Sequence, residues 1–436
     1  MKPNEEKQSD ERGANAAPQS SKGSASGKLT RRWSRLRKVL VGLAIAVPVS
    51  IAGLWYTSQH VPWVGAFLAD SLRAILGPDA VQRLEEVAYG WQDQWNQWTR
   101  GGEAPKRYWD APTTTANPST PMPAPIPAAA LAEDAGASEA GVVLQPFHPV
   151  DIGPIFPTVA AEGDGVWVPV VLPNSKDEPP FVFKTLLHPD KKRAWAELFV
   201  VAIELRRVKL FAVAGTEEPR ATVAAARSYE RKGLIPKEHQ DALIAALNGG
   251  FKEEHGHWGM KVDGVVLVTP RDHACAIAAY EDGSYRVGTW KSLADTEPQM
   301  RFYRQTPPCL VEGGKLHPAL SDENTNWGAA LGGDTVVRRS AIGLDARHEV
   351  LYLALSNATS ARAIAVGMLH AGGADVAQLD INYSYPRIVL FHKNASESPK
   401  AEALFPGFAF KDDDYVERAS SRDFFYLLRE ETAAKP

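Results

Sequence analysis

The chain has 436 residues, of which 44% are hydrophobic and 23% are charged, values that are ordinary for a globular protein with room for more than one folded unit. Its formal net charge is −4 at pH 7, so no general attraction for nucleic acid is expected.

The first 38 residues form a polar and basic tail. Residues 1–30 are rich in Ser, Gly, Ala, Glu and Lys without periodicity, which predicts disorder. Basic side chains then concentrate at Arg31, Arg32, Arg35, Arg37 and Lys38. Because positive charge collects on the cytoplasmic side of a membrane span, residues 1–38 are expected in the cytoplasm.

An apolar segment follows at residues 39–56. Its 18 residues are uncharged, and with flanking residues they are long enough to cross a hydrocarbon core of about 30 Å. An uncleaved transmembrane signal anchor is favoured over a cleaved signal peptide, since the basic region is long and no small-x-small cleavage site follows. The chain is therefore expected to be a single-pass membrane protein whose C-terminal domain is periplasmic or extracellular.

Residues 57–110 carry apolar positions at helical spacing, and Gly77-Pro78 interrupts the pattern. Two short amphipathic helices beside the membrane are predicted. Trp91, Trp95 and Trp98 repeat on the second helix and either rest in the bilayer interface, pack on the globular domain or self-associate. Residues 111–141, rich in Pro, Ala and Thr, predict a semi-extended linker that holds the domain away from the membrane.

The folded domain is expected to occupy residues 142–436. Short apolar runs typical of strands recur there, and Asp263-Gly264 and Asp282-Gly283 are typical hairpin turns. Strands are expected over 165–172, 198–203, 208–213, 262–268, 274–280, 351–355 and 387–391, and helices over 236–247 and 361–371. Many strands with few helices predict an α+β fold with a mixed or mainly antiparallel sheet, preceded by one transmembrane helix.

The chain has two cysteines, Cys275 and Cys309. Both lie in the domain that is expected outside the cytoplasm, where an even pair favours a disulfide. Two separate buried thiols are the alternative.

Two motifs place polar residues directly after apolar runs, where side chains gather on a rigid base. The first is Asn248-Gly249-Gly250-Phe251, which continues as Lys252-Glu253-Glu254-His255-Gly256-His257. The second is Asp380-Ile381-Asn382-Tyr383-Ser384. We expect Asn248 to end a helix or open a strand, and the amides of Gly249 and Gly250 to be accessible. A helix-terminating Asn-Gly turn is the alternative.

Asp380 is the candidate catalytic carboxylate. In an extended chain Asn382 and Ser384 point to the same side as Asp380, where they can bind sugar hydroxyls. An aspartate that only caps a turn is the alternative. Glycoside hydrolysis normally uses two acidic groups about 5–10 Å apart, so Glu254 is the candidate partner, and Glu253 would serve as well.

Cationic and aromatic residues complete the candidate site. His255 is a candidate acid or base, and Lys252 and His257 offer contacts to phosphate oxygens. His255 and His257 also suggest a metal, but no third ligand has a recognisable spacing, so no metal is expected. No organic cofactor is expected either. Arg339, with Arg338, would clamp a phosphodiester or form a surface salt bridge. The aromatic side chains Trp258, Tyr383 and Tyr385 would stack on sugar or pack in the core.

The motifs resemble those of the phosphodiester glycosidase family, the uncovering-enzyme-like glycosidases, over roughly residues 195–395. The family pattern is Asn-Gly-Gly-Phe-Phe, then Arg-x-x-Ile-Gly, then Leu-Asp-Gly-Gly-Gly-Ser, which here corresponds to residues 248–252, 339–343 and 379–384. Lys252 replaces the second Phe, and residues 381–383 replace the three glycines, which changes the conformations open to that loop. The resemblance implies roles for Asn248 and Asp380 in the active site.

The resemblance implies a hydrolase that cleaves a glycosidic bond to phosphate in a glycan or wall polymer, and the predicted anchor at residues 39–56 would make it a membrane-anchored protein of the cell envelope. The expected partners are this substrate and, through one helix, the membrane. A non-catalytic glycan-binding module or an exopolysaccharide-assembly scaffold is the alternative, which the altered loop at residues 380–384 favours.

Overall fold

The computed structural model describes residues 78–110, 146–172, 179–320, 336–382, 384–392 and 398–430, with single positions between residues 38 and 75. The chain divides into two units, Met1–Leu68 and Ala69–Pro436. In the first unit, most of the expected span at residues 39–56 lies outside the described residues. Its described positions, which include Val41 and Val49, are helical and exposed.

The expected linker at 111–141 also lies outside the described residues. In the part of the chain that is described, no helix combines the length and the apolar content that a membrane span requires. Helix α3, Pro78–Arg100, begins at the predicted Gly77-Pro78 break and contains Trp91, Trp95 and Trp98.

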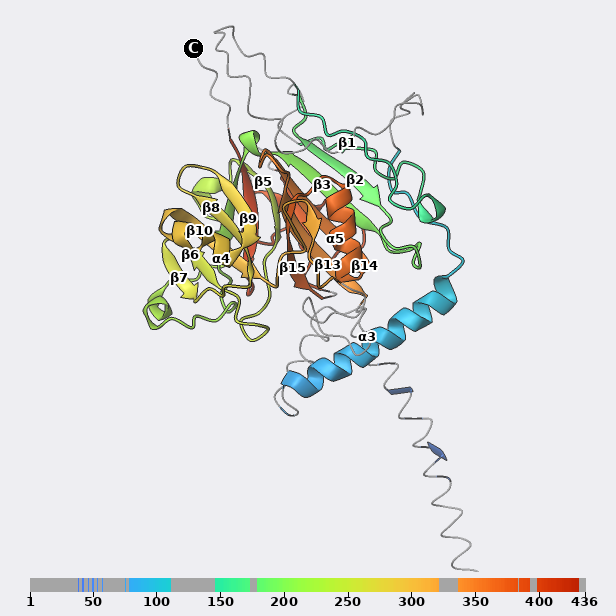
Figure 1. The fold of residues 1–436 in the computed structure, drawn as a ribbon. Coiled ribbons are helices and arrows are strands. Elements are labelled where there is room, and N and C mark those ends of the chain that lie inside the picture. The colour runs from blue at the N-terminus through green and yellow to red at the C-terminus, as the bar shows by residue number, and fades with distance from the viewer. Residues whose placement is uncertain are drawn as a thin grey trace, which may run out of the picture. The chain divides into compact units, whose positions relative to one another are not determined.

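Three sheets form the body of the second unit (Figure 1). The largest has eight strands in the order β1-β2-β3-β14-β13-β15-β11-β12. Their bounds are β1 Val168–Pro169, β2 Val182–Leu187, β3 Leu198–Glu204, β14 Val350–Thr359, β13 Val337–Leu344, β15 Asp375–Ile381, β11 Val311–Glu312 and β12 Lys315–Leu316.

The other two sheets have five strands each, in the orders β7-β6-β10-β8-β9 and β17-β16-β5-β18-β4. The first contains β7 Val265–Val268, β6 Met260–Val262, β10 Met300–Thr306, β8 Cys275–Tyr280 and β9 Tyr285–Thr289. The second contains β17 Lys400–Ala403, β16 Ile388–His392, β5 Leu243–Asn248, β18 Phe424–Arg429 and β4 Val208–Val213. Pairings between the named strands of the described residues are antiparallel, which confirms the expected α+β class.

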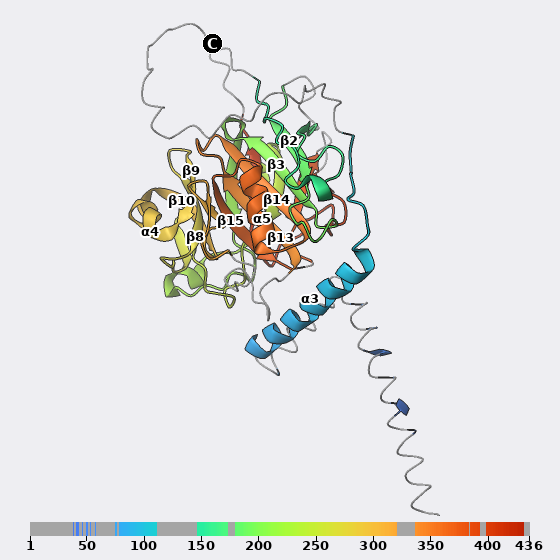
Figure 2. The same cartoon turned by 45° about the vertical axis from the view of Figure 1, so that its right-hand side comes forward.

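Alternating side chains on the central strands separate two cores. On β3, Phe199 and Val201 face a core shared with the five-stranded sheets, whereas Leu198 and Val200 pack on the other side with Met368 of helix α5. Helix α5, Ala361–His370, confirms the helix predicted there, and the Ser360 hydroxyl caps it by accepting from the Ala363 amide at 3.1 Å. Both views show α5 lying over β13, β14 and β15 (Figure 2).

The helix predicted over residues 236–247 is wrong. The structure has a short 3-10 helix at Lys237–His239 and then strand β5, which lies between β16 and β18 with every residue buried. A strand buried on both faces shows no alternation, so its apolar run is indistinguishable from that of a buried helix. Helix α4, Trp290–Leu293, is the remaining α-helix of the described domain.

Other local predictions hold or need only new boundaries. The expected strand over 262–268 is a hairpin of β6 and β7, in which Asp263 and Gly264 have φ of 51° and 73°, as a type I′ turn requires. Of the strand expected over 165–172, only Val168–Pro169 pairs. The predicted disulfide between Cys275 and Cys309 is confirmed, and both residues are buried.

Candidate functional site

The two polar motifs lie side by side at the ends of strands β5 and β15. The Asp380 amide donates to the Gly249 carbonyl at 3.1 Å. The Asn248 side chain donates to Ser340 Oγ at 2.8 Å, and this hydroxyl in turn donates to the Asp380 carbonyl at 3.3 Å. The backbone of Asp380 is therefore held by the first motif, although 132 residues (380 − 248) separate them in sequence.

The Asn248 side chain is buried and bonds to other groups of the protein. It is 0% exposed, and its amide group also donates to the Gly249 carbonyl at 3.0 Å. Its Oδ1 accepts from the Arg387 amide at 3.1 Å. Both amide hydrogens and the oxygen of Asn248 are therefore bonded within the protein, where they position the motif, and its role toward substrate stays a prediction.

The amides of Gly249 and Gly250 are not accessible, contrary to the expectation. The Gly249 amide donates to the Asp423 carbonyl at 2.9 Å, and the Gly250 amide donates to Asp423 Oδ2, also at 2.9 Å. A Cβ on Gly249 would lie 2.2 Å from Asp423 Oδ2, and a Cβ on Gly250 would lie 2.8 Å from the Arg304 guanidinium. The glycines therefore allow a close approach to a buried ion pair.

That ion pair, Arg304 with Asp423, was not predicted. Arg304 Nε lies 2.7 Å from Asp423 Oδ2, and their side chains are 0% and 2% exposed. The only sequence signal is that Arg422 and Asp423 directly precede the apolar strand β18, whereas the two motifs follow their apolar runs.

Arg422 binds the predicted catalytic carboxylate directly. Its Nη2 donates to Asp380 Oδ2 at 2.7 Å and to the Gly250 carbonyl at 3.1 Å. Asn382 Nδ2 donates to the same carboxylate oxygen at 2.9 Å. Burial raises the pKa of Asp380, and the positive charges of Arg422 and His255 partly oppose that rise. A carboxylate with this raised pKa is a stronger base than an exposed aspartate.

Asn382 bonds to Asp380 and Ser384 bonds to Asn382, and the chain reaches this arrangement through a turn and not the expected extended strand. Asn382 Oδ1 accepts from the amides of Ser384 and Tyr385, at 2.9 and 2.6 Å. The chain therefore turns directly after β15 ends at Ile381. Tyr383 lies outside the described residues.

The loop after the first motif brings His255 to the site, but it directs Glu254 elsewhere. Glu254 forms an ion pair with Arg220 at 3.0 Å and lies 3.7 Å from His255 Nε2. His255 is coupled electrostatically to Asp380. His255 therefore interacts electrostatically with both Asp380 and Glu254.

The remaining polar residues of the loop bond mainly within it. The Glu253 carboxylate bonds to His257 Nδ1, and the Glu253 amide donates to Glu218 at 2.9 Å. Lys252, 22% exposed at its side chain, lies 3.9 Å from Glu254. Lys252 therefore adds positive charge at the open side of this loop.

Neither predicted arginine clamp faces solvent freely. Arg339 is 2% exposed, and it donates to the Thr359 carbonyl at 2.9 Å and to Gln378 Oε1 at 2.8 Å. Arg338 donates to the Gly407 carbonyl at 3.0 Å. Arg339 thus braces β13 against its neighbours, and Arg422 is the guanidinium that meets Asp380.

The described aromatic residues support the site from within. Trp258 is 8% exposed and packs against Phe251 and Ala274, as its core alternative proposed. Tyr385 is also 8% exposed; its hydroxyl bonds to the Asp423 carbonyl, and the Arg422 guanidinium lies 4.4 Å from the centre of its ring. Tyr385 therefore holds Arg422 in place and is not an exposed sugar platform.

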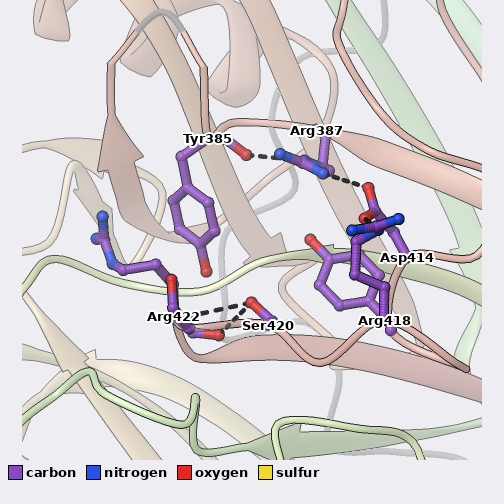
Figure 3. Close-up of a pocket in the computed structure, with 8 residues that line it drawn as sticks. Tyr385, Arg387, Asp414, Arg418, Ser420 and Arg422 are labelled. Atoms are coloured by element: carbon purple, nitrogen blue, oxygen red, sulfur yellow. Dashed lines mark hydrogen bonds and ion pairs between the residues drawn. The ribbon is translucent and has the colours of Figure 1, made fainter. Parts of the chain in front are cut away.

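A cavity of about 180 Å³ adjoins Arg422 and Tyr385 (Figure 3). Its lining includes Tyr415 and Arg418, and Arg387 is held there by Asp414 at 2.5 Å. Within the described residues, Tyr415 Oη and Arg422 Nε are buried without a hydrogen-bond partner. Burial raises the pKa of Tyr415 to about 12, so its hydroxyl remains a donor near neutral pH. The cavity is therefore lined mainly by phenol, guanidinium, hydroxyl and carboxylate side chains.

Among the residues that the structure describes, no three or more His, Cys, Asp or Glu side chains are grouped so that they could hold a metal ion. His257 pairs with Glu253 of the same loop.

No protein-family model and no curated protein sequence matches this chain. The chain is similar to the solved catalytic domain of zebrafish N-acetylglucosamine-1-phosphodiester alpha-N-acetylglucosaminidase, auto-inhibited by its pro-peptide. The identity is 14%, over 60% of this chain and 87% of that one, with a TM-score of 0.38.

A hypothetical protein from Synechocystis is 12% identical over 58% of this chain and 64% of its own, with a TM-score of 0.36. A putative exported protein from Burkholderia pseudomallei K96243 is 12% identical over 53% and 74%, with a TM-score of 0.26. All three similarities are distant.

Proposed function

We propose that the chain hydrolyses a glycosidic bond between a sugar and phosphate, with Asp380 as the reacting carboxylate. The observation that carries this proposal is the placement of Asp380. Its Oδ2 accepts from Arg422 and Asn382, burial raises its pKa, and both polar motifs converge on it. Such a carboxylate can accept a proton from an attacking water or attack the anomeric carbon itself.

The phosphate leaving group explains why one carboxylate suffices. A phosphate monoester has a second pKa of about 6, so it departs as a stable anion with little need of a proton from the protein. Cationic groups that balance its charge matter more than a strong acid. His255 and Lys252 lie on the loop beside Asp380 and supply that charge, and Arg422 supplies more.

Hydrolysis of a panel of glycosyl phosphodiesters by the purified chain tests the proposal. Asp380→Asn should lower kcat by about 10²–10⁴-fold while the protein stays folded, because an amide neither accepts the proton nor attacks carbon. Asp345→Asn is the matched control, since Asp345 caps the turn between β13 and β14 by accepting from the Glu349 and Val350 amides. Equal activity of the wild type and the Asp380→Asn variant would refute the assignment.

Variants of His255 and Glu254 test which of these two loop residues assists Asp380 in catalysis. His255→Gln should lower kcat because its charge is coupled to Asp380. Glu254→Gln should have the smaller effect because Glu254 forms an ion pair with Arg220. A larger loss in Glu254→Gln would restore Glu254 as the partner acid.

A second function, glycan binding without catalysis, is favoured by one observation. Asp380 is only 3% exposed, so little of its carboxylate meets solvent. If the chain binds a glycosyl phosphate without hydrolysing it, and Asp380→Asn leaves the affinity unchanged, binding or assembly replaces the enzymatic proposal.

We also propose that residues 39–56 anchor the chain in a membrane and that the domain lies outside the cytoplasm. The uncharged apolar segment and the preceding basic residues support this topology. Protease added to spheroplasts should digest the domain and spare residues 1–38. Complete protection of the domain would reverse the orientation.

A further inference from the structure

Helix α3 has two faces of opposite character. Successive helical residues are turned by about 100°, so Asp93, Gln97 and Arg100 fall within about 60° of one another. On the opposite side of the helix, the residues of an apolar stripe fall within about 80° of one another. The stripe consists of Leu84, Val87, Trp91, Trp95 and Trp98.

The polar face is bound to the folded domain. Arg193 donates to both oxygens of Asp93, from Nε at 2.8 Å and from Nη2 at 2.6 Å. The Arg193 and Asp93 side chains are 5% and 10% exposed, and Arg100 lies 5.6 Å from the centre of the Trp195 ring. A bidentate buried ion pair fixes the rotation of α3, so the helix cannot turn its stripe onto the domain.

The segment after α3 reinforces this attachment. Tyr108 Oη donates to Glu197 at 2.6 Å, and Trp109 contacts Phe199 and the Lys184 ammonium. The segment is therefore held at Asp93 by the loop between β2 and β3, and at Trp109 by Lys184 and Phe199 of those two strands.

The apolar stripe, in contrast, is exposed. Leu84 and Val87 are 53% and 43% exposed, and the three tryptophans are 75%, 63% and 78% exposed. A contiguous stripe of this kind on a soluble surface marks an interaction site. Tryptophan is the side chain that gathers at the boundary between lipid and water, because it joins a large apolar ring to one donor.

We propose that α3 lies in the plane of a membrane interface, with its stripe among the lipids and its polar face holding the domain. The chain itself favours lipid as the occupant. This inference rests on the proposed anchor at residues 39–56, which ends 22 positions (78 − 56) before α3 begins, so the connecting chain limits how far α3 can lie from that bilayer. Six of the 23 residues of α3 are charged, which favours a position along the surface over one across the hydrocarbon core.

Nitroxide labels on the full chain test this orientation. The two native cysteines form a disulfide, so one introduced cysteine is the only free thiol. Leu84→Cys places the label on the stripe. Gly90→Cys is the matched control, because Gly90 is exposed, points about 120° away and has no atom within 4 Å of its Cβ position. Leu84 and Gly90 are both exposed positions of α3, so each cysteine variant should retain the fold.

The measurement is the accessibility of each label to oxygen, which partitions into lipid, and to a nickel chelate, which stays in water. The full chain is reconstituted in vesicles of phosphatidylcholine and phosphatidylglycerol. The label at residue 84 should show the higher ratio of oxygen to nickel accessibility. Equal, water-like ratios at both sites would overturn the proposal. Spin–spin broadening at residue 84 without oxygen enrichment would also overturn it and assign the stripe to a second copy of the chain.

Discussion

Removing one partner of the Arg304–Asp423 ion pair should destabilise the domain strongly. In the Asp423→Asn variant the Arg304 charge remains fully buried without a counter-charge. Asp423 Oδ2 accepts from Arg304 Nε at 2.7 Å and from the Gly250 amide at 2.9 Å, so the asparagine oxygen is best placed there. Its NH₂ group then faces Arg304 Nη2, which is also a donor and lies 3.3 Å from Oδ1 in the wild type.

The expected loss is about 3–5 kcal/mol of unfolding free energy, the cost of an uncompensated buried charge. Solvent does not screen this interaction, since the Arg304 and Asp423 side chains are 0% and 2% exposed. Carbonyls of Phe251, Trp258 and Gln305 still accept from Arg304, but they carry no net charge.

Urea titration of the disulfide-intact protein measures the loss. Asp413→Asn is the control, because the Asp413 and Arg418 side chains are 26% and 47% exposed, so that loss of their ion pair should change the stability little. Arg304→Met combined with Asp423→Leu should cost less than the sum of the single changes, because the double variant leaves no unpaired charge. A loss in Asp423→Asn no larger than that in Asp413→Asn would refute the reasoning.

Three further predictions concern the same site and its support. Gly249→Ala should lower the free energy of unfolding by about 1–3 kcal/mol, since its Cβ would lie 2.2 Å from Asp423 Oδ2 and 2.4 Å from the Asp423 carbonyl oxygen. An unchanged urea midpoint would show that this contact is easily relieved. Cys275 and Cys309 are 34 positions apart, so reduction of their disulfide should lower the free energy of unfolding by about 3–4 kcal/mol in the chain-entropy model. Urea titration with and without reductant measures this loss, and equal midpoints would contradict it. Hydrolysis should require ionised Asp380, so kcat should fall as pH drops through a pKa that burial raises above about 4. Arg422→Gln removes a charge that lowers this pKa and should shift the acid limb to higher pH, whereas a shift to lower pH would assign the limb to another group.

Local sequence patterns determined the elements whose signals do not depend on distant neighbours. The Asp263-Gly264 turn and the helix at Ala361–His370 follow from backbone preferences and spacing that a few residues contain. The pairing of Cys275 with Cys309 followed from there being two cysteines in one domain. The proximity of Asp380, Asn382 and Ser384 could also be predicted, because they lie within five residues.

Only the tertiary structure decided which charges meet. Arg422 reaches Asp380 because β18 lies beside β5 in one sheet, whereas Arg339, which a family motif singled out, is buried between strands. Residues 243–248 form a strand and not a helix because sheet neighbours bury both faces of it. An apolar run specifies burial, but its conformation and the partners of a charge depend on segments that are distant in the sequence, whose approach no local pattern encodes.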